Sequence, residues 1–416
     1  MKICLVTAFP PSRRGLNEYG YHIARELQRD PLLSLTILAD YLDTPATELQ
    51  DFDVQRCWFF DRLSNPPRLL SALREIRPDV VWFNLLFSTF GTRPLPAFCG
   101  LSIPALTRMC GIYTHVTLHH LMDNIDLRDL GVRHTRLYRW AGSLTTRTLL
   151  MANSISVLLP AYRRTLMEKY RGENVHFRAH GILSARPEYP DFSRRGNPEH
   201  RIVAFGKWGT YKRLELLIEA FELVAAQVPN LRLIVAGGNH PMAPGYVESV
   251  AQRYSGSRSV EFTGYVPEER IAELFSAASV VIMPYSSATG SSGVAHLACA
   301  FGVPIISADV SDFREMAADE DLAIDFYTTG NPASLAEKLV KFLQDPRRQR
   351  EMALQNFSAA LRMTMPQIIR QYIRSFNLHQ KSKILEPIAR FRRLPAWIPS
   401  RSAIFRAAAP RWSPWM

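Results

Sequence analysis

The part of the sequence best suited to bind an anion is a run of small residues between an expected strand and an expected helix. The run comprises Thr289, Gly290, Ser291, Ser292 and Gly293. The apolar pattern of residues 279–284 predicts a buried strand before it, and an apolar segment after it ends at Gly302–Pro304. Unpaired N–H groups at a helix start attract negative charge, and glycine and serine leave them open to a phosphate. An ordinary capped helix with a flexible entry would use the same residue types, so other residues must decide.

Two histidines and a glycine stand at other positions that suit a ligand. His119 and His120 follow the strand pattern that begins at His115, and Gly15 lies in the turn after the first strand. In parallel α/β sheets, ligands bind beyond the carboxyl ends of the strands, so these positions predict ligand contacts. Hydrogen-bonded structural histidines and a simple turn glycine are the alternative interpretations.

Strand and helix patterns alternate along the chain in two series, separated by the charged, proline-containing stretch 188–201. The alternation predicts an α/β protein with two doubly wound parallel sheets whose ligands lie in a central cleft. We place a first domain at residues 1–190, a second at 200–364, a returning helix at 365–380 and a basic tail at 381–416.

Composition limits the class of protein. The chain has 416 residues, of which 47% are hydrophobic and 21% charged, which suits a globular protein with two domains. Its five scattered cysteines lack C-x-x-C spacing, which argues against a zinc site and favours a reducing cytoplasm. No apolar run reaches the roughly 20 residues that cross a bilayer, and the first one is too short for a signal peptide. We therefore expect a cytoplasmic protein that binds, if at all, to the inner face of the membrane.

The net charge of +12 suits nucleic acid, anionic lipid or a phosphorylated substrate as a partner. No helix-turn-helix, zinc-finger or RNA-binding motif is present, so nucleic acid is not an expected partner. In residues 381–416, basic residues alternate with aromatic ones such as Trp397 and Trp412, as in segments that bind anionic membranes. A disordered terminus, or one packed on the body of the protein, is the alternative.

Three segments resemble retaining glycosyltransferases of family 4. They are FGKWGTYKRLELLIEAF, FTGYVPEERIAELFSAASVVIMP, and AHLACAFGVPIISAD followed by FREM. The resemblance extends to about Phe376 and is more specific in the second half than in the first. It implies the GT-B architecture, in which two Rossmann-like domains face a cleft. A nucleotide-diphosphate sugar then binds mostly to the second domain, and the acceptor approaches from the first.

The resemblance assigns cationic and histidine roles to particular residues. Lys207, which follows Gly206, and Lys212 take the positions of two cations that contact the diphosphate. Lysine at position 207 replaces the family's arginine, which keeps the charge and loses the bidentate fork. His119 matches a first-domain histidine near the sugar and phosphate, with His120 as the neighbouring candidate.

Two further donor contacts follow from the same resemblance. Gly264, Tyr265 and Val266 match the turn whose backbone contacts the base. Glu315 matches the glutamate that ends a later glycine-rich segment, although the glycines themselves are absent here.

The main departure from the family concerns two glutamates, separated by seven residues, that contact the sugar and the ribose. Thr289 and Leu297 stand at those positions, and neither accepts hydrogen bonds as a carboxylate does. We expect His296 or a main-chain group to take over. Weaker nucleotide binding, or a loss of catalysis, are the alternatives.

The expected activity is transfer of a sugar, with retention, from a nucleotide-diphosphate sugar to a glycan or lipid-linked acceptor in polysaccharide or glycolipid biosynthesis. Lys207, Lys212 and the amides of residues 289–293 would stabilise the leaving diphosphate, and His119 would stabilise the oxocarbenium-like centre. The sequence offers no carboxylate pair of the hydrolase kind and no D-x-D metal site, so we expect no obligatory cofactor or metal. A non-catalytic glycosyltransferase-like binding or scaffold subunit is the alternative. A phosphorylase of the same architecture would need a pyridoxal-phosphate lysine setting, which no sequence feature supports.

Overall fold

The computed structural model divides into two units by its internal contacts, Met1–Ile368 and Ile369–Met416. For residues 384 and 386–392 it describes the backbone alone. The described residues are 1–42, 49–124, 135–184, 186–192, 200–240, 243–257, 259–287 and 290–392. Thr289 of the small-residue run and most of the basic tail therefore lie outside the described residues.

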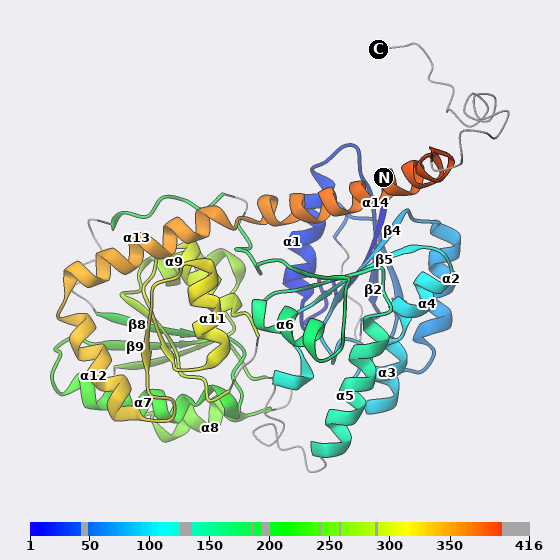
Figure 1. Cartoon of the computed structure of the whole chain (residues 1–416). Coiled ribbons are helices and arrows are strands. Elements are labelled where there is room, and N and C mark those ends of the chain that lie inside the picture. Colours follow the sequence, from blue (N-terminus) through cyan, green and yellow to red (C-terminus); the bar gives the residue numbers. More distant parts are fainter. Residues whose placement is uncertain are drawn as a thin grey trace. The chain divides into compact units, whose positions relative to one another are not determined.

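Two parallel sheets form the centre of the first unit (Figure 1). The first sheet has the strand order β3-β2-β1-β4-β5-β6-β7. Its strands are β1 (Lys2–Val6), β2 (Ser34–Asp40), β3 (Val54–Trp58), β4 (Val80–Leu85), β5 (Tyr113–Leu118), β6 (Ser154–Val157) and β7 (Val175–Phe177). The second sheet has the order β10-β9-β8-β11-β12-β13. Its strands are β8 (Arg201–Phe205), β9 (Arg232–Ala236), β10 (Val260–Gly264), β11 (Val280–Met283), β12 (Ile305–Ala308) and β13 (Ile324–Tyr327). The expected pair of doubly wound parallel sheets is confirmed.

Helices cover both faces of each sheet (Figure 1), and this explains why central strands such as β4 and β11 are buried along their whole length. The helices of the first half are α1 (Asn17–Gln28), α2 (Asn65–Ile76), α3 (Pro94–Leu101), α4 (Ile103–Met109), α5 (Thr135–Leu149) and α6 (Pro160–Glu168). Those of the second half are α7 (Leu214–Ala225), α8 (Tyr246–Arg253), α9 (Glu268–Ser276), α10 (Gly293–Ala300), α11 (Ser311–Glu320), α12 (Pro332–Leu343) and α13 (Pro346–Arg362). After α13 the chain returns to the first half, where Ile182 donates its N–H to the Met363 carbonyl at 2.9 Å.

Helices α3 and α4 were not predicted, because prolines were interpreted as breaks in this apolar region. Pro94 and Pro104 lie in the first turns of the two helices, where the missing N–H of proline leaves no bond unmade. The last helix, α14 (Met365–Arg392), extends well beyond the expected residues 367–376. Residues 381–392 are therefore helical, as their good helix formers allow, and do not begin an irregular tail.

The strand order reverses between β1 and β4 in the first sheet and between β8 and β11 in the second. Ligands of open α/β sheets bind at the carboxyl ends of the strands at such a reversal. The loop after β8 carries Lys207 and Lys212, and the loop after β11 leads to Gly293. The fold thus brings the basic loop and the small-residue loop to the same edge of the second sheet.

Candidate functional site

Lys212 is a buried cation without a carboxylate partner among the described residues. It ends the short turn Thr210–Lys212, and its Nζ atom lies 4.8 Å from the centre of the Tyr285 ring and 5.8 Å from that of Trp208. Burial, together with the charge of Lys207, lowers the pKa of Lys212 from 10.5 to about 8. Lys207 itself is exposed. The site therefore holds a desolvated positive charge that no anionic side chain of the described residues neutralises.

The Lys212 ammonium lies beside the first turn of α10. A Cβ atom built on Gly206, which follows β8 with φ of 145°, would be 2.6 Å from Lys212 Nζ and 3.9 Å from Val294 Cγ2. The backbone conformation favours glycine at position 206, and a side chain there would displace the Lys212 ammonium. The same distances place the basic loop and the start of α10 next to each other, as the sequence predicted.

Some polar groups of the small-residue run are hydrogen-bonded within the protein, and others are free to bind a ligand. The Gly290 N–H donates to Asp312 Oδ2 at 3.3 Å, and the Ser292 hydroxyl accepts from the Ala295 N–H at 3.3 Å as the cap of α10. Ser291 makes a long contact to Met316 Sδ at 3.8 Å. The N–H groups of Gly293 and Val294 find no acceptor in the part of the chain that the structure describes. The N–H groups of Ser291 and Ser292 likewise find no acceptor among the described residues. Within the described run only the Gly290 N–H is bonded, so the backbone from Ser291 to Gly293 is open to an anion.

His119 is held by a chain of buried hydrogen bonds behind the end of β5. Its Nε2 lies 2.7 Å from Asn84 Oδ1, and Asn84 Nδ2 donates to Thr7 Oγ1 at 3.1 Å. Burial, with the neighbouring His180 and His120, holds the pKa of His119 well below its ordinary value. A neutral ring that donates from Nε2 carries its lone pair on Nδ1. His119 can therefore accept a hydrogen bond from a hydroxyl group. His120 is half-buried, and desolvation lowers its pKa to about 4.

His180 joins this group although the sequence analysis did not select it. Its ring centre lies 6.0 Å from that of His119, 4.7 Å from that of Tyr19 and 4.8 Å from that of His296, on which it stacks. Its Nε2 is 4.0 Å from the position that a Cβ on Gly293 would occupy. Burial and the adjacent His296 lower the pKa of His180 to about 3. A histidine directly before a glycine, at the end of the last strand segment of the first half, was the available signal.

Neutral His180 offers a lone pair towards the start of α10. Its Nδ1 lies 2.8 Å from the Gly181 carbonyl oxygen, which can only accept, so the ring proton is on Nδ1. The lone pair is then on Nε2, the atom nearer Gly293. His119 and His180 thus provide two imidazole acceptors beside one helix start.

Both ring nitrogens of His296 are engaged within the protein. Nδ1 lies 2.7 Å from the Ser292 carbonyl oxygen, and Nε2 lies 2.8 Å from Glu320 Oε2. Burial acts to lower the pKa of His296, but the charge and hydrogen bond of Glu320 outweigh it and raise the pKa. Direct binding of ribose by His296 would require one of these bonds to break. Leu297, at the position of the family's second glutamate, offers no polar group.

Glu315 belongs to α11, and its carboxylate contacts the start of α6 in the first half. Its Oε2 accepts from the Ala161 N–H at 3.0 Å, and its Oε1 accepts from Arg164 at 2.7 Å. Nearby, the Tyr162 hydroxyl donates to Asp312 Oδ2 at 2.7 Å, and burial raises the pKa of Asp312. In this structure the Glu315 carboxylate therefore binds a helix start of the first half.

Gly264, Tyr265 and Val266 follow the end of β10, at the same edge of the second sheet as the basic loop. Gly264 has φ of 65° and accepts the Gly237 N–H on its carbonyl at 2.7 Å. Tyr265 exposes 78% of its surface, so its ring is open to contact with a planar ligand.

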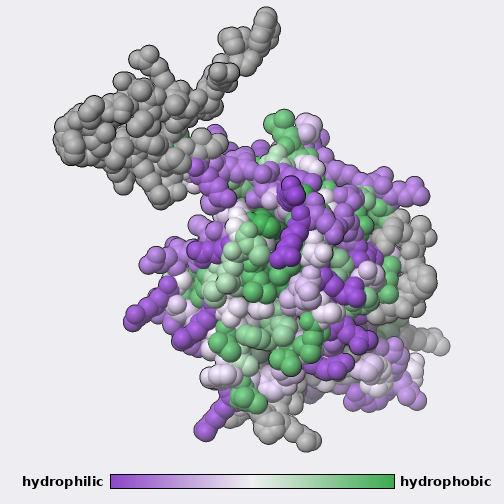
Figure 2. Space-filling view, turned by 90° about the vertical axis from the view of Figure 1, so that its right-hand side faces the viewer, coloured by the Kyte–Doolittle hydropathy of each residue, from purple (hydrophilic) through white to green (hydrophobic). Residues whose placement is uncertain are grey.

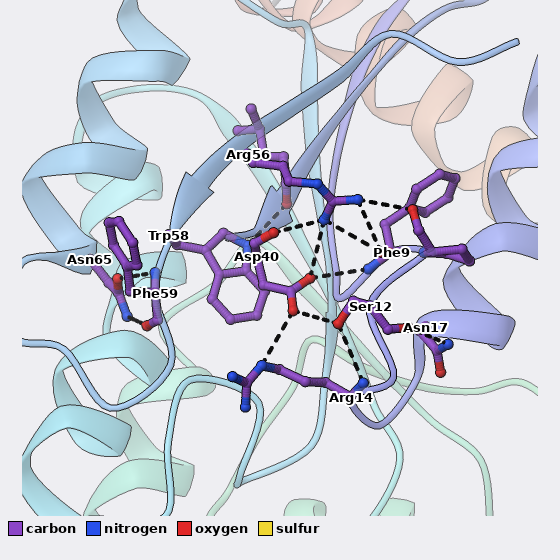
Figure 3. A network of polar contacts seen from close by, with 11 residues as sticks. Phe9, Ser12, Arg14, Asn17, Asp40, Arg56, Trp58, Phe59 and Asn65 are labelled. Carbon is purple, nitrogen blue, oxygen red and sulfur yellow. Dashed lines mark hydrogen bonds and ion pairs between the residues drawn. The ribbon is translucent and has the colours of Figure 1, made fainter. Parts of the chain in front are cut away.

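Gly15 lies in the loop between β1 and α1, which a buried polar network holds in place (Figure 3). Asp40, at the end of β2, accepts from the Ser12 hydroxyl at 2.6 Å and pairs with Arg14 at 3.4 Å. Arg56 donates to the Asp40 carbonyl at 2.7 Å. A Cβ on Gly15 would be 3.0 Å from Leu86 Cδ1 in the loop after β4. Gly15 thus lies at the reversal point of the first sheet, where its lack of a side chain allows the close approach.

The described residues contain no group of three or more histidine, cysteine, aspartate or glutamate side chains placed to hold a metal ion. None of their helices is both long enough and apolar enough to span a membrane.

The second half of the chain matches a known protein family. Residues 199–345 match the family model described as glycosyl transferases group 1. A phosphatidyl-myo-inositol mannosyltransferase of Propionibacterium freudenreichii subsp. shermanii is 26% identical over 182 residues, which are 43% of this chain and 44% of that protein. The chain thus matches less than half the length of this relative.

Solved structures of similar fold cover nearly the whole chain. A sucrose-phosphate synthase of Thermosynechococcus elongatus aligns with a TM-score of 0.73 and 16% identity, over 92% of this chain and all (100%) of that one. HepE of Anabaena, in a complex with UDP-glucose, aligns with a TM-score of 0.66 and 16% identity, over 91% of this chain and 99% of that one. At such identities the likeness shows the fold, and it confirms the expected GT-B architecture of two Rossmann-like halves.

Proposed function

We propose that this chain, whose residues 199–345 form a glycosyl transferases group 1 domain, transfers a sugar with retention from a nucleotide-diphosphate sugar to a glycan or lipid-linked acceptor. We further propose that it does so without an obligatory divalent ion, on the cytoplasmic side of the membrane, in polysaccharide or glycolipid biosynthesis. The names of the matched relative and the UDP-glucose bound by HepE support a nucleotide-sugar donor.

The observation that carries the proposal is the uncompensated charge of Lys212 beside the start of α10. A diphosphate would supply the missing anion, and the N–H groups of Gly293 and Val294 would bind its oxygens. Exposed Lys207 would add a second positive charge from the same loop. Negative charge grows on the diphosphate as the anomeric C–O bond breaks, so preorganised cations and amides stabilise the transition state more than the bound donor.

The neutral histidines fit the sugar side of such a reaction. His119 and His180 each present a lone pair, and a sugar hydroxyl is the donor that an imidazole acceptor binds. In retention by front-face transfer, the leaving phosphate takes the acceptor's proton, so no carboxylate base is required. The two histidines would then orient the sugar and so take over the sugar contact that a glutamate makes in the family.

The first experiment is calorimetric titration with UDP, GDP and their sugars, followed by an assay of donor hydrolysis and transfer with a mixed acceptor pool. We expect one nucleotide to bind and its sugar to be released or transferred, with the product's anomeric configuration unchanged by NMR. Lys212→Ala should lower turnover by about 100-fold and weaken nucleotide binding much less. Lys338→Ala, at an exposed position on α12, is the matched control and should behave as the wild type.

The competing function is a binding or scaffold subunit without transfer. Leu297 and the two engaged nitrogens of His296 favour it, because neither side chain offers a free polar group to the ribose. Tight nucleotide binding with no turnover on any donor would support this reading. Full activity of Lys212→Ala on a proven donor, or no binding of any nucleotide, would contradict the proposed role of the site.

A further inference from the structure

Helix α5 inverts the usual distribution of residues on a surface helix. Its buried face consists mainly of small residues, and its large apolar residues face outward. The buried residues are Gly142, Thr145, Thr146 and Leu149. The exposed ones are Leu137 (61% exposed), Trp140 (65%) and Leu144 (41%). Spacing of three and four residues places these three side chains on one face of the helix.

The buried face is fixed by close packing, so the outward position of Trp140 is not an accident of a loosely placed helix. A Cβ on Gly142 would be 3.0 Å from Met122 Cβ, which shows how closely the helix approaches the turn Met122–Asn124. Thr145 and Thr146 return their hydroxyls to the Ala141 and Gly142 carbonyls at 2.8 and 2.9 Å. The opposite face therefore has to point outward.

Arginines flank the exposed apolar row. Arg136 lies four residues before Trp140, and Arg147 lies three residues after Leu144, so both border the same face. Both are exposed, and neither has a carboxylate partner within the described part of the chain. Figure 2 looks onto the side of the first half that carries α2 to α5, and hydrophobic residues gather there among hydrophilic ones. Met109 ends α4, a helix that packs on α5, and is 73% exposed.

We propose that this face of α5 docks the protein onto an anionic lipid bilayer. An aromatic and two leucines suit the boundary between headgroups and acyl chains, and exposed arginines that pair with no described carboxylate suit anionic headgroups. A protein partner would more often require carboxylates opposite the arginines and a dry apolar centre. The proposal goes beyond sugar transfer and does not depend on it, because binding to vesicles needs no donor.

The test is flotation of the full chain with vesicles of phosphatidylcholine alone and of phosphatidylcholine mixed with phosphatidylglycerol. We expect binding to the mixed vesicles, and binding about tenfold weaker or more for Trp140→Ser/Leu144→Ser. The matched control is Leu354→Ser/Leu361→Ser, which removes two similarly exposed leucines (43% and 46%) from α13 and should bind as the wild type. Arg136→Gln/Arg147→Gln, which leaves the apolar row intact, should weaken binding to the mixed vesicles about twentyfold and leave binding to phosphatidylcholine unchanged.

Several results would overturn the proposal. One is a wild-type chain that stays in the unbound fraction. Another is α5 variants that float as well as the α13 control, because any membrane contact would then lie elsewhere. A second copy of the chain is the other candidate to cover this face. It would be indicated by a wild-type dimer in light scattering that the Trp140→Ser/Leu144→Ser variant converts to a monomer without a change in vesicle binding. Donor titration in the absence of vesicles separates failure here from failure of the proposed function.

Discussion

Replacing Lys212 by methionine should make the folded protein more stable while it removes activity. Methionine has nearly the length of the lysine stem and no charge, so it fills the same space against Tyr285 and Trp208. The lysine has no anionic partner among the described residues, and its burial opposes folding as long as its amine is protonated to the charged ammonium. Such a residue is expected where function, not stability, requires the charge.

The size of the effect follows from the pKa of Lys212. The fall from 10.5 to about 8 corresponds to about 3 kcal/mol of stability lost to the buried charge. Attraction to the Tyr285 ring, worth roughly 1–2 kcal/mol in a desolvated position, is lost in the variant. We therefore expect Lys212→Met to raise the free energy of unfolding by about 1–2 kcal/mol at about pH 7.

The pH dependence of the stability gain tests separately whether Lys212→Met stabilises the protein. Because the pKa of Lys212 is lower in the folded than in the unfolded chain, the penalty is full below about pH 8 and disappears as the pH rises past 10.5. Urea unfolding should therefore show a gain for Lys212→Met at about pH 7 that shrinks to below about 1 kcal/mol at about pH 10. Lys338→Met, at an exposed position, should change little at either pH. A variant less stable than the wild type at about pH 7, or a gain that does not change with pH, would refute the reasoning.

Three further predictions concern the same site. The kcat/KM for the donor should fall about tenfold per pH unit above about pH 8, as the Lys212 ammonium of the free protein loses its proton, and this fall should be absent from the residual activity of Lys212→Met. Tyr162→Phe should lower the free energy of unfolding by about 1–3 kcal/mol in urea, because it removes the shorter of the two hydrogen bonds that the buried Asp312 carboxyl accepts and leaves only the longer one from the Gly290 N–H; an unchanged midpoint would show that water replaces the hydroxyl. Gly290→Ala should lower both stability, by about 1–3 kcal/mol, and turnover, because φ is 83° and the new Cβ would be 2.7 Å from the His119 carbonyl oxygen; wild-type values for both would contradict the close approach.

The parts of the fold that could be predicted from the sequence are those that local pattern determines. Short apolar runs such as residues 280–283 and 202–205 predicted buried strands, and the parallel order then placed the loop of Lys212 beside the start of α10. Helices α3 and α4 were missed because a proline reads as a break in the sequence, whereas in the structure it occupies a first turn.

The site could be predicted only in part, since several of its contacts join distant segments. Nothing local to His180 indicates that it stacks on His296, which is more than a hundred residues away in the chain. The engagement of His296 by Glu320 was hidden for the same reason, because their pairing depends on the packing of α10 against α11. The sequence could select the histidine but could not show that both its nitrogens were already bound.

The contact of Gly290 with the His119 carbonyl has a consequence for how quickly a donor can enter. No space remains between these two backbones, and the stacked rings of His180 and His296 also join the two halves. If a sugar nucleotide binds at this edge, the two halves have to separate first. Its association rate would then be limited by the frequency of that opening and not by diffusion. The buried bond between Tyr162 and Asp312 also joins the two halves and has to break in such an opening, so it would lengthen the time that a donor waits.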